Sequence, residues 1–298
     1  MAFRLPFSAL LLLSVLAPDG IRAQSFRAQS DLVVLQAVVM DRHSDVVADL
    51  TREEFRVYED GRPQTIRFFV SEDRPVAVGL VVDNSLSMLN KRSEVIAAAD
   101  AFGRSSNPGD ALFTVNFNEH VTFGLPRDVA FTSDLAVLHD TMSQIQARGK
   151  TAMYDAVAAA LDHVATGPID DRVLIVVSDG GDNSSRIDFR AVLERAQRSN
   201  AVIYSIGIVD DLSGDVDRRA LQRLASATGG LALFPENVKQ VRPMFERIAR
   251  DIRHRYVIGY VPDNPRTDEG FRTVRVAAFD RASRKPLQVR SRNGYFPS

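Results

Sequence analysis

The chain contains no cysteine, which excludes disulfides, thiolate chemistry and zinc–thiolate sites. It also lacks a large net charge of either sign: the sequence has 37 Lys and Arg against 38 Asp and Glu, and the formal charge is −1. This balance gives no global attraction to nucleic acid or to an anionic membrane, and we expect neither as a partner. The 298 residues, 45% hydrophobic and 25% charged, are typical of a soluble globular protein with one sizeable domain and a smaller one.

Long apolar runs are scarce too, and the one that stands out lies at the N-terminus, from Phe7 to Ala17 after Arg4. Polar and small residues follow it, which predicts a secretory signal peptide over residues 1–23, cleaved near Ala23. The run is shorter than the ~20 apolar residues that span a bilayer comfortably, although an uncleaved anchor remains the alternative. We therefore expect a secreted, periplasmic or cell-envelope protein with no membrane span after cleavage.

The middle of the chain, residues 75–255, alternates apolar strands with amphipathic helices. The strand candidates are residues 76–83, 111–118, 120–126, 172–179, 201–210 and 231–236. Several are nearly continuous apolar runs, as strands covered on both faces require. The pattern predicts an α/β fold with a doubly wound, mostly parallel six-stranded sheet and helices on both faces. Residues 120–126 follow the preceding strand too closely for a parallel crossover, so we expect an antiparallel edge strand there.

The two flanks, residues 31–72 and 256–298, have the alternation of β-strands. In FRVYEDGRPQTIRFF, the Asp60-Gly61 pair predicts a hairpin between two alternating runs. The second run would place Ile66 and Phe68 on one face and Phe69 on the other. Neither flank can cover its own apolar face, so we expect both to pack into one small β-domain that carries the α/β domain as an insertion.

Polar side chains follow two of the predicted parallel strands. Asp83 ends the first strand and is followed by Ser85 and Ser87, and Asp179 ends the fourth. Thr151 stands at the start of a predicted helix between them. Because ligands of open α/β sheets bind beyond the carboxyl ends of the strands, we expect these five residues to converge on one crevice.

The five side chains offer two carboxylates and three hydroxyls, with no nitrogen or sulfur. This set predicts a divalent cation of the hard class, with Mg²⁺ favoured and Mn²⁺ or Ca²⁺ as alternatives. Two charges among five ligands leave a coordination position open and the ion electropositive. A carboxylate from outside could fill that position, which makes the site one for binding rather than catalysis.

Simpler roles remain open for several of these residues. Ser85 and Ser87 could cap a helix, and Asp179 could shape a glycine turn. Asp182 and Asn84 are candidates for contacting the ligands rather than the ion, although Asp182 could equally be a solvated turn residue. We do not expect Asp155 to be a metal ligand, because it lies beyond the start of the helix. The histidines at positions 43, 120, 139, 163 and 254 have no spacing typical of a metal site.

The segment DNSLS matches the D-x-S-x-S signature of von Willebrand factor A domains, and all five positions of that family's pattern occur in order over about residues 75–255. The resemblance implies a metal-ion-dependent adhesion site in which the five residues bind the ion, some through water. The flanks LTREEFRVYEDGRPQTIRFF and RSRNGYF are similar to extensions of secreted von Willebrand-related proteins common in acidobacteria. One departure is Gly149-Lys150, where many relatives carry Gly-Gly; we expect Lys150 to point to solvent because lysine is strongly hydrated.

These features predict a secreted, metal-dependent protein-binding module whose partner presents an Asp or Glu to the cation. One alternative is a structural envelope module whose metal site is unused. The other is an aspartate-based phosphohydrolase, but that chemistry needs a second carboxylate where Ser85 stands. Neither a G-x-S-x-G elbow nor a P-loop occurs in the sequence, and we expect no enzyme.

Overall fold

The computed structural model describes residues 32–179, 181–208, 217–263 and 270–297, and all of them belong to one compact unit. The predicted signal peptide and the end of the predicted strand 201–210 lie outside these residues. Within the described ranges, every helix is too short or too polar to cross a bilayer.

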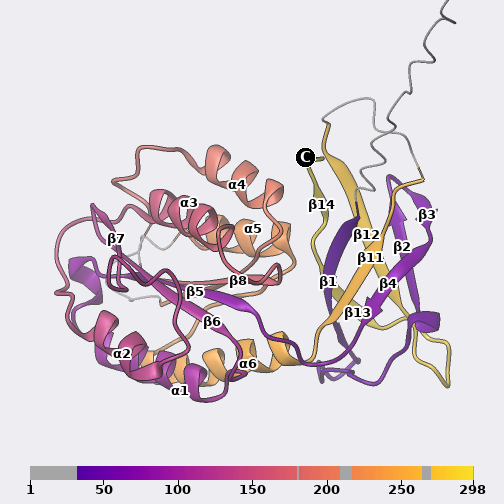
Figure 1. Ribbon diagram of the computed structural model, residues 1–298, viewed down its shortest axis with the longest axis horizontal. Coiled ribbons are helices and arrows are strands. Elements are labelled where there is room, and N and C mark those ends of the chain that lie inside the picture. The colour runs from indigo at the N-terminus through magenta and orange to yellow at the C-terminus, as the bar shows by residue number, and fades with distance from the viewer. Residues whose placement is uncertain (1–31, 180, 209–216, 264–269, 298) are drawn as a thin grey trace, which may run out of the picture. The chain divides into compact units, whose positions relative to one another are not determined.

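A six-stranded sheet forms the centre of the α/β part, in the order β10-β9-β8-β5-β6-β7 (Figure 1). Its strands are β5 (Ala77–Asp83), β6 (Ala111–Phe117), β7 (Val121–Phe123), β8 (Arg172–Ser178), β9 (Val202–Gly207) and β10 (Ala232–Leu233). All neighbours are parallel except β7, which pairs antiparallel with β6 at the edge. The mostly parallel sheet and its antiparallel edge strand are confirmed.

Helices cover both faces of this sheet, with α3, α4 and α5 on one side and α1, α2 and α6 on the other (Figure 1). The helices are α1 (Arg92–Arg104), α2 (Leu135–Ser143), α3 (Met153–Val164), α4 (Phe189–Arg198), α5 (Arg218–Thr228) and α6 (Val241–Arg253), with short 3-10 turns η1 (Arg52–Glu54), η2 (Leu86–Met88) and η3 (Val238–Gln240). Apolar residues at helical spacing bury one side of each: in α6, Val241, Phe245, Ile248 and Ile252 face the sheet.

The strands of the two flanks form two four-stranded antiparallel sheets, β13-β1-β11-β4 and β14-β12-β2-β3. These strands are β1 (Val33–Met40), β2 (Phe55–Glu59), β3 (Arg62–Gln64), β4 (Ile66–Val70), β11 (Tyr256–Tyr260), β12 (Arg272–Ala278), β13 (Gln288–Ser291) and β14 (Gly294–Tyr295). Each sheet mixes strands from before and after the α/β part, since β1 pairs with β11 and β2 pairs with β12. The β-structure built from both flanks is therefore confirmed.

The hairpin at Asp60-Gly61 is present, but its second arm is shorter than predicted. Asp60 (φ 48°) and Gly61 (φ 78°) form the turn, and β3 ends at Gln64. The chain then crosses to the other sheet, where β4 pairs with β11. The crossing places the ring of Phe69 in the core, 5.3 Å from that of Phe55 between ring centroids.

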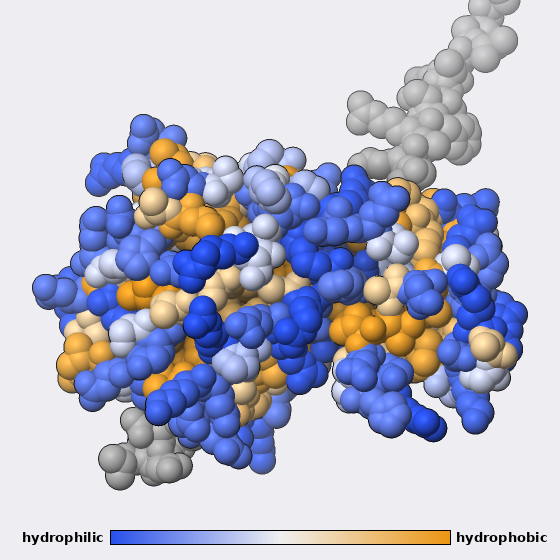
Figure 2. All heavy atoms as spheres, turned by 90° about the horizontal axis from the view of Figure 1, so that it is seen from below, coloured by the Kyte–Doolittle hydropathy of each residue, from blue (hydrophilic) through white to orange (hydrophobic). Residues whose placement is uncertain are grey.

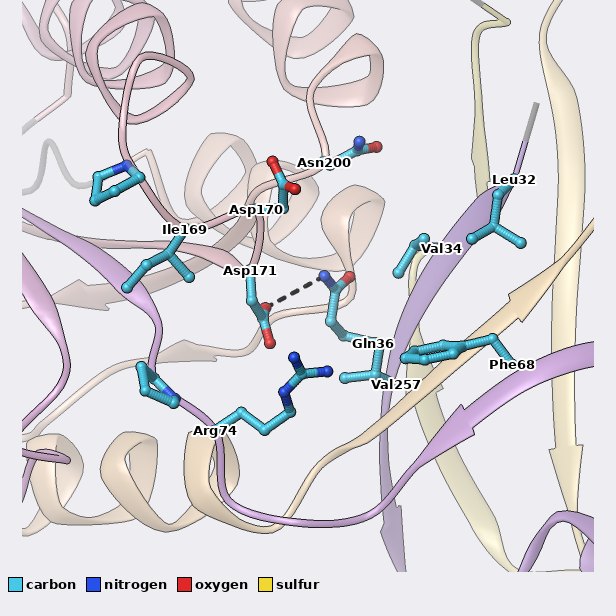
Figure 3. Close-up of a pocket in the computed structure, with 12 residues that line it drawn as sticks. Leu32, Val34, Gln36, Phe68, Arg74, Ile169, Asp170, Asp171, Asn200 and Val257 are labelled. Carbon is cyan, nitrogen blue, oxygen red and sulfur yellow. Dashed lines mark hydrogen bonds between the residues drawn. The ribbon is translucent and has the colours of Figure 1, made fainter. Parts of the chain in front are cut away.

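Several contacts join the α/β part to the β part. Gln36 of β1 donates a 3.4 Å hydrogen bond to Oδ1 of Asp171, just before β8 (Figure 3). Arg255 pairs with the same oxygen at 2.7 Å. Arg290 of β13 binds Asp251 of α6. On the face seen in Figure 2, hydrophilic side chains predominate and apolar ones form separate patches, a broad one on the β part.

Candidate functional site

The carboxyl end of β5 delivers Asp83 to the edge of the sheet, where its side chain is completely buried. Oδ1 accepts a 2.8 Å hydrogen bond from the backbone N–H of Ser85, and Oδ2 accepts one of 2.6 Å from Oγ of Ser178. Ser178 ends β8, the neighbouring strand, whose residue Val177 is in register with Val82. The fold thus fixes the orientation of this carboxylate from two strands.

The two serines of the DNSLS segment connect Asp83 to the end of β8. Ser85 precedes the 3-10 turn η2 but makes no side-chain capping bond; instead its Oγ lies 3.0 Å from Oγ of Ser87. Ser87 donates a 2.8 Å bond to Oδ1 of Asp179, a residue that is buried. Four of the five predicted residues are therefore brought together in one hydrogen-bonded group.

Thr151, the fifth residue, is buried on an adjoining loop. Its backbone N–H donates to Oδ1 of Asn183 at 2.9 Å, and its carbonyl accepts bonds from the N–H groups of Asn183 and Ser184. The loop meets the DNSLS segment through its backbone, because Leu86 N–H donates to the carbonyl of Gly149 at 3.3 Å. The backbone of Thr151 is thus fixed by the 183–184 segment, and its loop contacts the DNSLS segment at Gly149, but Thr151 is not part of the hydrogen-bonded group of the other four residues.

A lysine completes the group. Nζ of Lys91 lies 2.5 Å from Oδ2 of Asp179, and the two side chains are 11% and 0% exposed. Lys91 directly precedes α1 and stands eight residues after Asp83 in the chain. Its ammonium offsets one of the two carboxylate charges at this edge of the sheet.

The charged form of Asp83 is destabilised by its surroundings. Burial raises the pKa of Asp83 to about 6, and the charge of Asp179 adds to the rise, against the hydrogen bonds from Ser178 and Ser85. Among the described residues, no three His, Asp or Glu side chains gather as they would around a metal. An ion at this edge would therefore depend on hydroxyl oxygens and water as well as on the two carboxylates.

Asn84 and Asp182 form hydrogen bonds with the segments around the candidate ligands. The amide of Asn84 donates to the carbonyl of Val82 at 3.1 Å and to Oδ1 of Asn116 at 3.0 Å, which ties the DNSLS segment to β6. Oδ2 of Asp182 accepts a 2.9 Å bond from the N–H of Tyr154, so this aspartate caps the start of α3, the helix after Thr151. Both residues therefore stabilise the backbone segments to which the candidate ligands belong.

Two residues of this group, Lys91 and Ser178, were not predicted from the sequence. The serine could have been found, because it ends the strand next to β5 and a hydroxyl there faces the same edge. The lysine gives no such signal, since its long stem leaves the direction of its ammonium undefined. Lys150, by contrast, is exposed, as expected.

Exposed apolar side chains flank the group on its outer side. Leu86 lies between the two serines and is 62% exposed, and Leu89 is 59% exposed. A hollow of about 400 Å³ is lined by Asn84 of the DNSLS segment and by Asn118 and Arg148 among others. The surroundings of the candidate site thus combine apolar and hydrogen-bonding surface, as protein interfaces do.

A larger hollow, of about 720 Å³, lies away from these residues at the junction of the two parts (Figure 3). Leu32, Val34 and Phe68 form one wall, and Arg74 and Asp171 face the interior. It contains none of the five candidate ligands.

The model of the von Willebrand factor type A domain family matches residues 78–247, more than half of the chain. A search of curated proteins found no match. Among solved structures, a von Willebrand factor type A protein from Catenulispora acidiphila is 14% identical, with a TM-score of 0.54, 90% of this chain covered and 75% of that chain.

Two further structures share the fold of the α/β part. The vWF domain of the type V pili tip protein Mfa5 from Porphyromonas gingivalis is 15% identical over 60% of this chain and 95% of its own, with a TM-score of 0.51. Proximal thread matrix protein 1 from the mussel byssus, with a zinc-occupied MIDAS motif, is 16% identical over 65% and 49%, with a TM-score of 0.52.

Proposed function

Since the chain belongs to the von Willebrand factor type A domain family, we propose that it binds a partner protein through a divalent cation at the edge of the six-stranded sheet. The proposed ligands, direct or through water, are Asp83, Ser85, Ser87, Thr151 and Asp179. The observation that carries this proposal is the hydrogen-bonded group from Asp83 through the two serines to Asp179, which gathers two buried carboxylates and two hydroxyls.

The donor set fits a hard cation. Carboxylate and hydroxyl oxygens suit Mg²⁺, with Mn²⁺ or Ca²⁺ as alternatives, better than soft metals. The byssus protein, whose structure has a zinc-occupied MIDAS motif, supports metal binding by this kind of site. When bound, the cation would supply a positive charge with an open coordination position. The chain's own residues hold the two carboxylates in place and exclude water from beneath them.

The proposed partner group is a carboxylate, from an Asp or Glu on another protein. Leu86, between the two serines, and the nearby Leu89 are exposed and would offer apolar contact to the surface around that carboxylate. The structural likeness to a domain of a pili tip protein supports a role outside the cytoplasm. We propose that this chain likewise acts in the cell envelope or is secreted, after removal of residues 1–23.

Isothermal titration of the purified protein with Mg²⁺ and with Mn²⁺ tests the metal. We expect binding to the wild type, and at least a tenfold weaker interaction for Asp179→Asn, which keeps the size of the side chain but removes its charge. An exposed carboxylate outside this group, Asp162, provides the control variant Asp162→Asn. Absence of Mg²⁺ and Mn²⁺ binding to the wild type at millimolar ion would refute the proposal.

The open coordination position is tested with Mn²⁺ as a paramagnetic probe. Water-proton relaxation of the Mn²⁺-loaded protein should fall when acetate is added, because the carboxylate replaces a bound water molecule. Acetamide, which has the same shape and no charge, is the matched control and should have little effect. Equal responses to both compounds would contradict the proposed carboxylate recognition.

A further inference from the structure

The ion pair of Lys91 with Asp179 occupies the position where the proposed divalent cation would need its second carboxylate. The contact of 2.5 Å joins an ammonium that is 11% exposed to a carboxylate that is fully buried. An ion pair with so little water around it is screened far less than a surface pair. It is therefore a defined part of the site rather than a chance contact of a mobile lysine.

Every carboxylate oxygen of the site already has a partner. The two oxygens of Asp83 accept bonds from Ser85 and Ser178, and those of Asp179 accept bonds from Ser87 and Lys91. Each carboxylate oxygen can accept more than one partner, so a divalent ion could share Asp179 with Ser87, but at Oδ2 it would lie close to the ammonium of Lys91. Displacing Lys91 relieves repulsion between two cations, so the ammonium is the partner that must move.

We propose that Lys91 is the resident cation of the site in the metal-free protein and sets its metal affinity by competing for Asp179. The inference rests on the proposed metal site. In the metal-free protein, the ammonium offsets a carboxylate charge that would otherwise be buried without a counter-charge. A divalent ion takes its place and drives the ammonium toward the rim, where the long stem can carry it into water.

Neighbouring cations do not share this role. The guanidinium of Arg92 donates to Oδ1 of Asn84 at 3.0 Å and to the carbonyl of Met142, which directs it toward α2. Lys150 stands beside Thr151 but is exposed. Lys91 can therefore be altered separately from the other positive charges around the site.

The test is titration of Mg²⁺ into the wild type, Lys91→Met, Lys91→Arg and the matched control Lys150→Met. Methionine keeps an unbranched stem without the charge, so Lys91→Met should bind Mg²⁺ about tenfold more tightly, which corresponds to about 1.4 kcal/mol. Lys91→Arg keeps the charge, and Lys150→Met removes one exposed to solvent; both should bind within about threefold of the wild type.

The outcomes separate the two proposals. Equal or weaker binding by Lys91→Met, with normal binding by the wild type, overturns the role of Lys91 and leaves the metal site intact. Absence of binding by both proteins overturns the metal site itself. Binding by Lys91→Met alone supports the competition by Lys91 and overturns metal binding by the wild-type protein.

Thermal unfolding supplies a readout that does not depend on the affinity measurement. Without metal, Lys91→Met should melt below the wild type, because Asp179 loses its counter-charge; with Mg²⁺ its rise in Tm should be the larger of the two. If the variant is unfolded without metal, recovery of its circular dichroism on adding Mg²⁺ supports the proposal. Failure to recover at any Mg²⁺ concentration that saturates the wild type overturns it.

Discussion

Ser87 donates a hydrogen bond of 2.8 Å to Asp179, although 92 residues separate them in the chain. One residue follows β5 and the other follows β8, two adjacent parallel strands, so the sheet brings their carboxyl ends to the same edge. The bond is therefore a direct contact between the two loops of the proposed metal site. Ser87 is also the most exposed of the five candidate ligand residues, since the other four are buried.

Ser87→Ala should weaken Mg²⁺ binding while leaving the fold intact. The change removes one hydroxyl ligand and one of the bonds that orient Asp179, and we expect a loss of about tenfold in affinity. Isothermal titration measures the loss, and Ser93→Ala, at an exposed serine near the start of α1, is the matched control. Wild-type affinity in Ser87→Ala would remove this serine from the ligand set.

Asp182→Ala should destabilise the start of α3 rather than abolish metal binding. Its carboxylate accepts bonds from the N–H of Tyr154 and from Oγ of Ser185, and loss of a helix cap costs about 1 kcal/mol. Urea denaturation measures the change in the free energy of unfolding. A loss of Mg²⁺ affinity as large as that of Ser87→Ala, without loss of stability, would make Asp182 a ligand instead.

The architecture of the α/β part could be predicted because its signals are local. Continuous apolar runs separated by helical periodicity require a covered parallel sheet, and the short connection before Val121 requires an antiparallel edge. The crossing of the chain between β3 and β4 could not be predicted in this way. It depends on Phe69 packing with Phe55 and with Tyr256, which comes from the far end of the chain.

In the candidate site too, some features could be predicted from the sequence and others could not. Strand ends place Asp83 and Asp179 without knowledge of the packing, because the carboxyl ends of parallel strands share an edge. The partners of their oxygens are decided by the register of β5 against β8, which sets Ser178 beside Asp83, and by the direction of a flexible lysine stem. Local sequence patterns predict neither the register of β5 against β8 nor the rotamer of Lys91.

Gly229→Ala should be strongly destabilising, because this glycine ends α5 with a φ of 86° and meets another segment closely. A Cβ there would lie 2.5 Å from the backbone N of Arg292 and 2.8 Å from the carbonyl carbon of Ser291. We expect a loss of at least about 2 kcal/mol in the free energy of unfolding, from the unfavourable φ and the clash together.

Gly61→Ala separates the cost of the positive φ from the cost of the steric clash. Gly61 has a similar φ of 78°, but a Cβ there would meet nothing within 4 Å. Its loss should be about 1 kcal/mol, from the backbone conformation alone. Equal losses in the two variants would show that the contact of Gly229 with the 291–292 segment adds nothing to stability.

Arg290→Met should destabilise the protein by removing the partner of a buried carboxylate. Arg290 of β13 pairs with Asp251 of α6, and their side chains are 14% and 3% exposed. Breaking a buried pair from one side costs about 3–5 kcal/mol, because the remaining charge stays out of water. Methionine preserves most of the apolar stem, so the effect measures the charge rather than the packing.

A second arginine provides the matched comparison, because Arg242 on α6 itself pairs with Glu246 at 3.7 Å and both side chains are about half exposed. Arg242→Met should change the free energy of unfolding by no more than about 1 kcal/mol, since water screens an exposed pair. Denaturation of both variants, followed by that of Arg290→Met combined with Asp251→Leu, isolates the cost of the unpaired charge. The double variant should recover much of the loss, because an apolar pair of similar volume leaves no buried carboxylate. A double variant as unstable as Arg290→Met would place the cost in lost packing between β13 and α6.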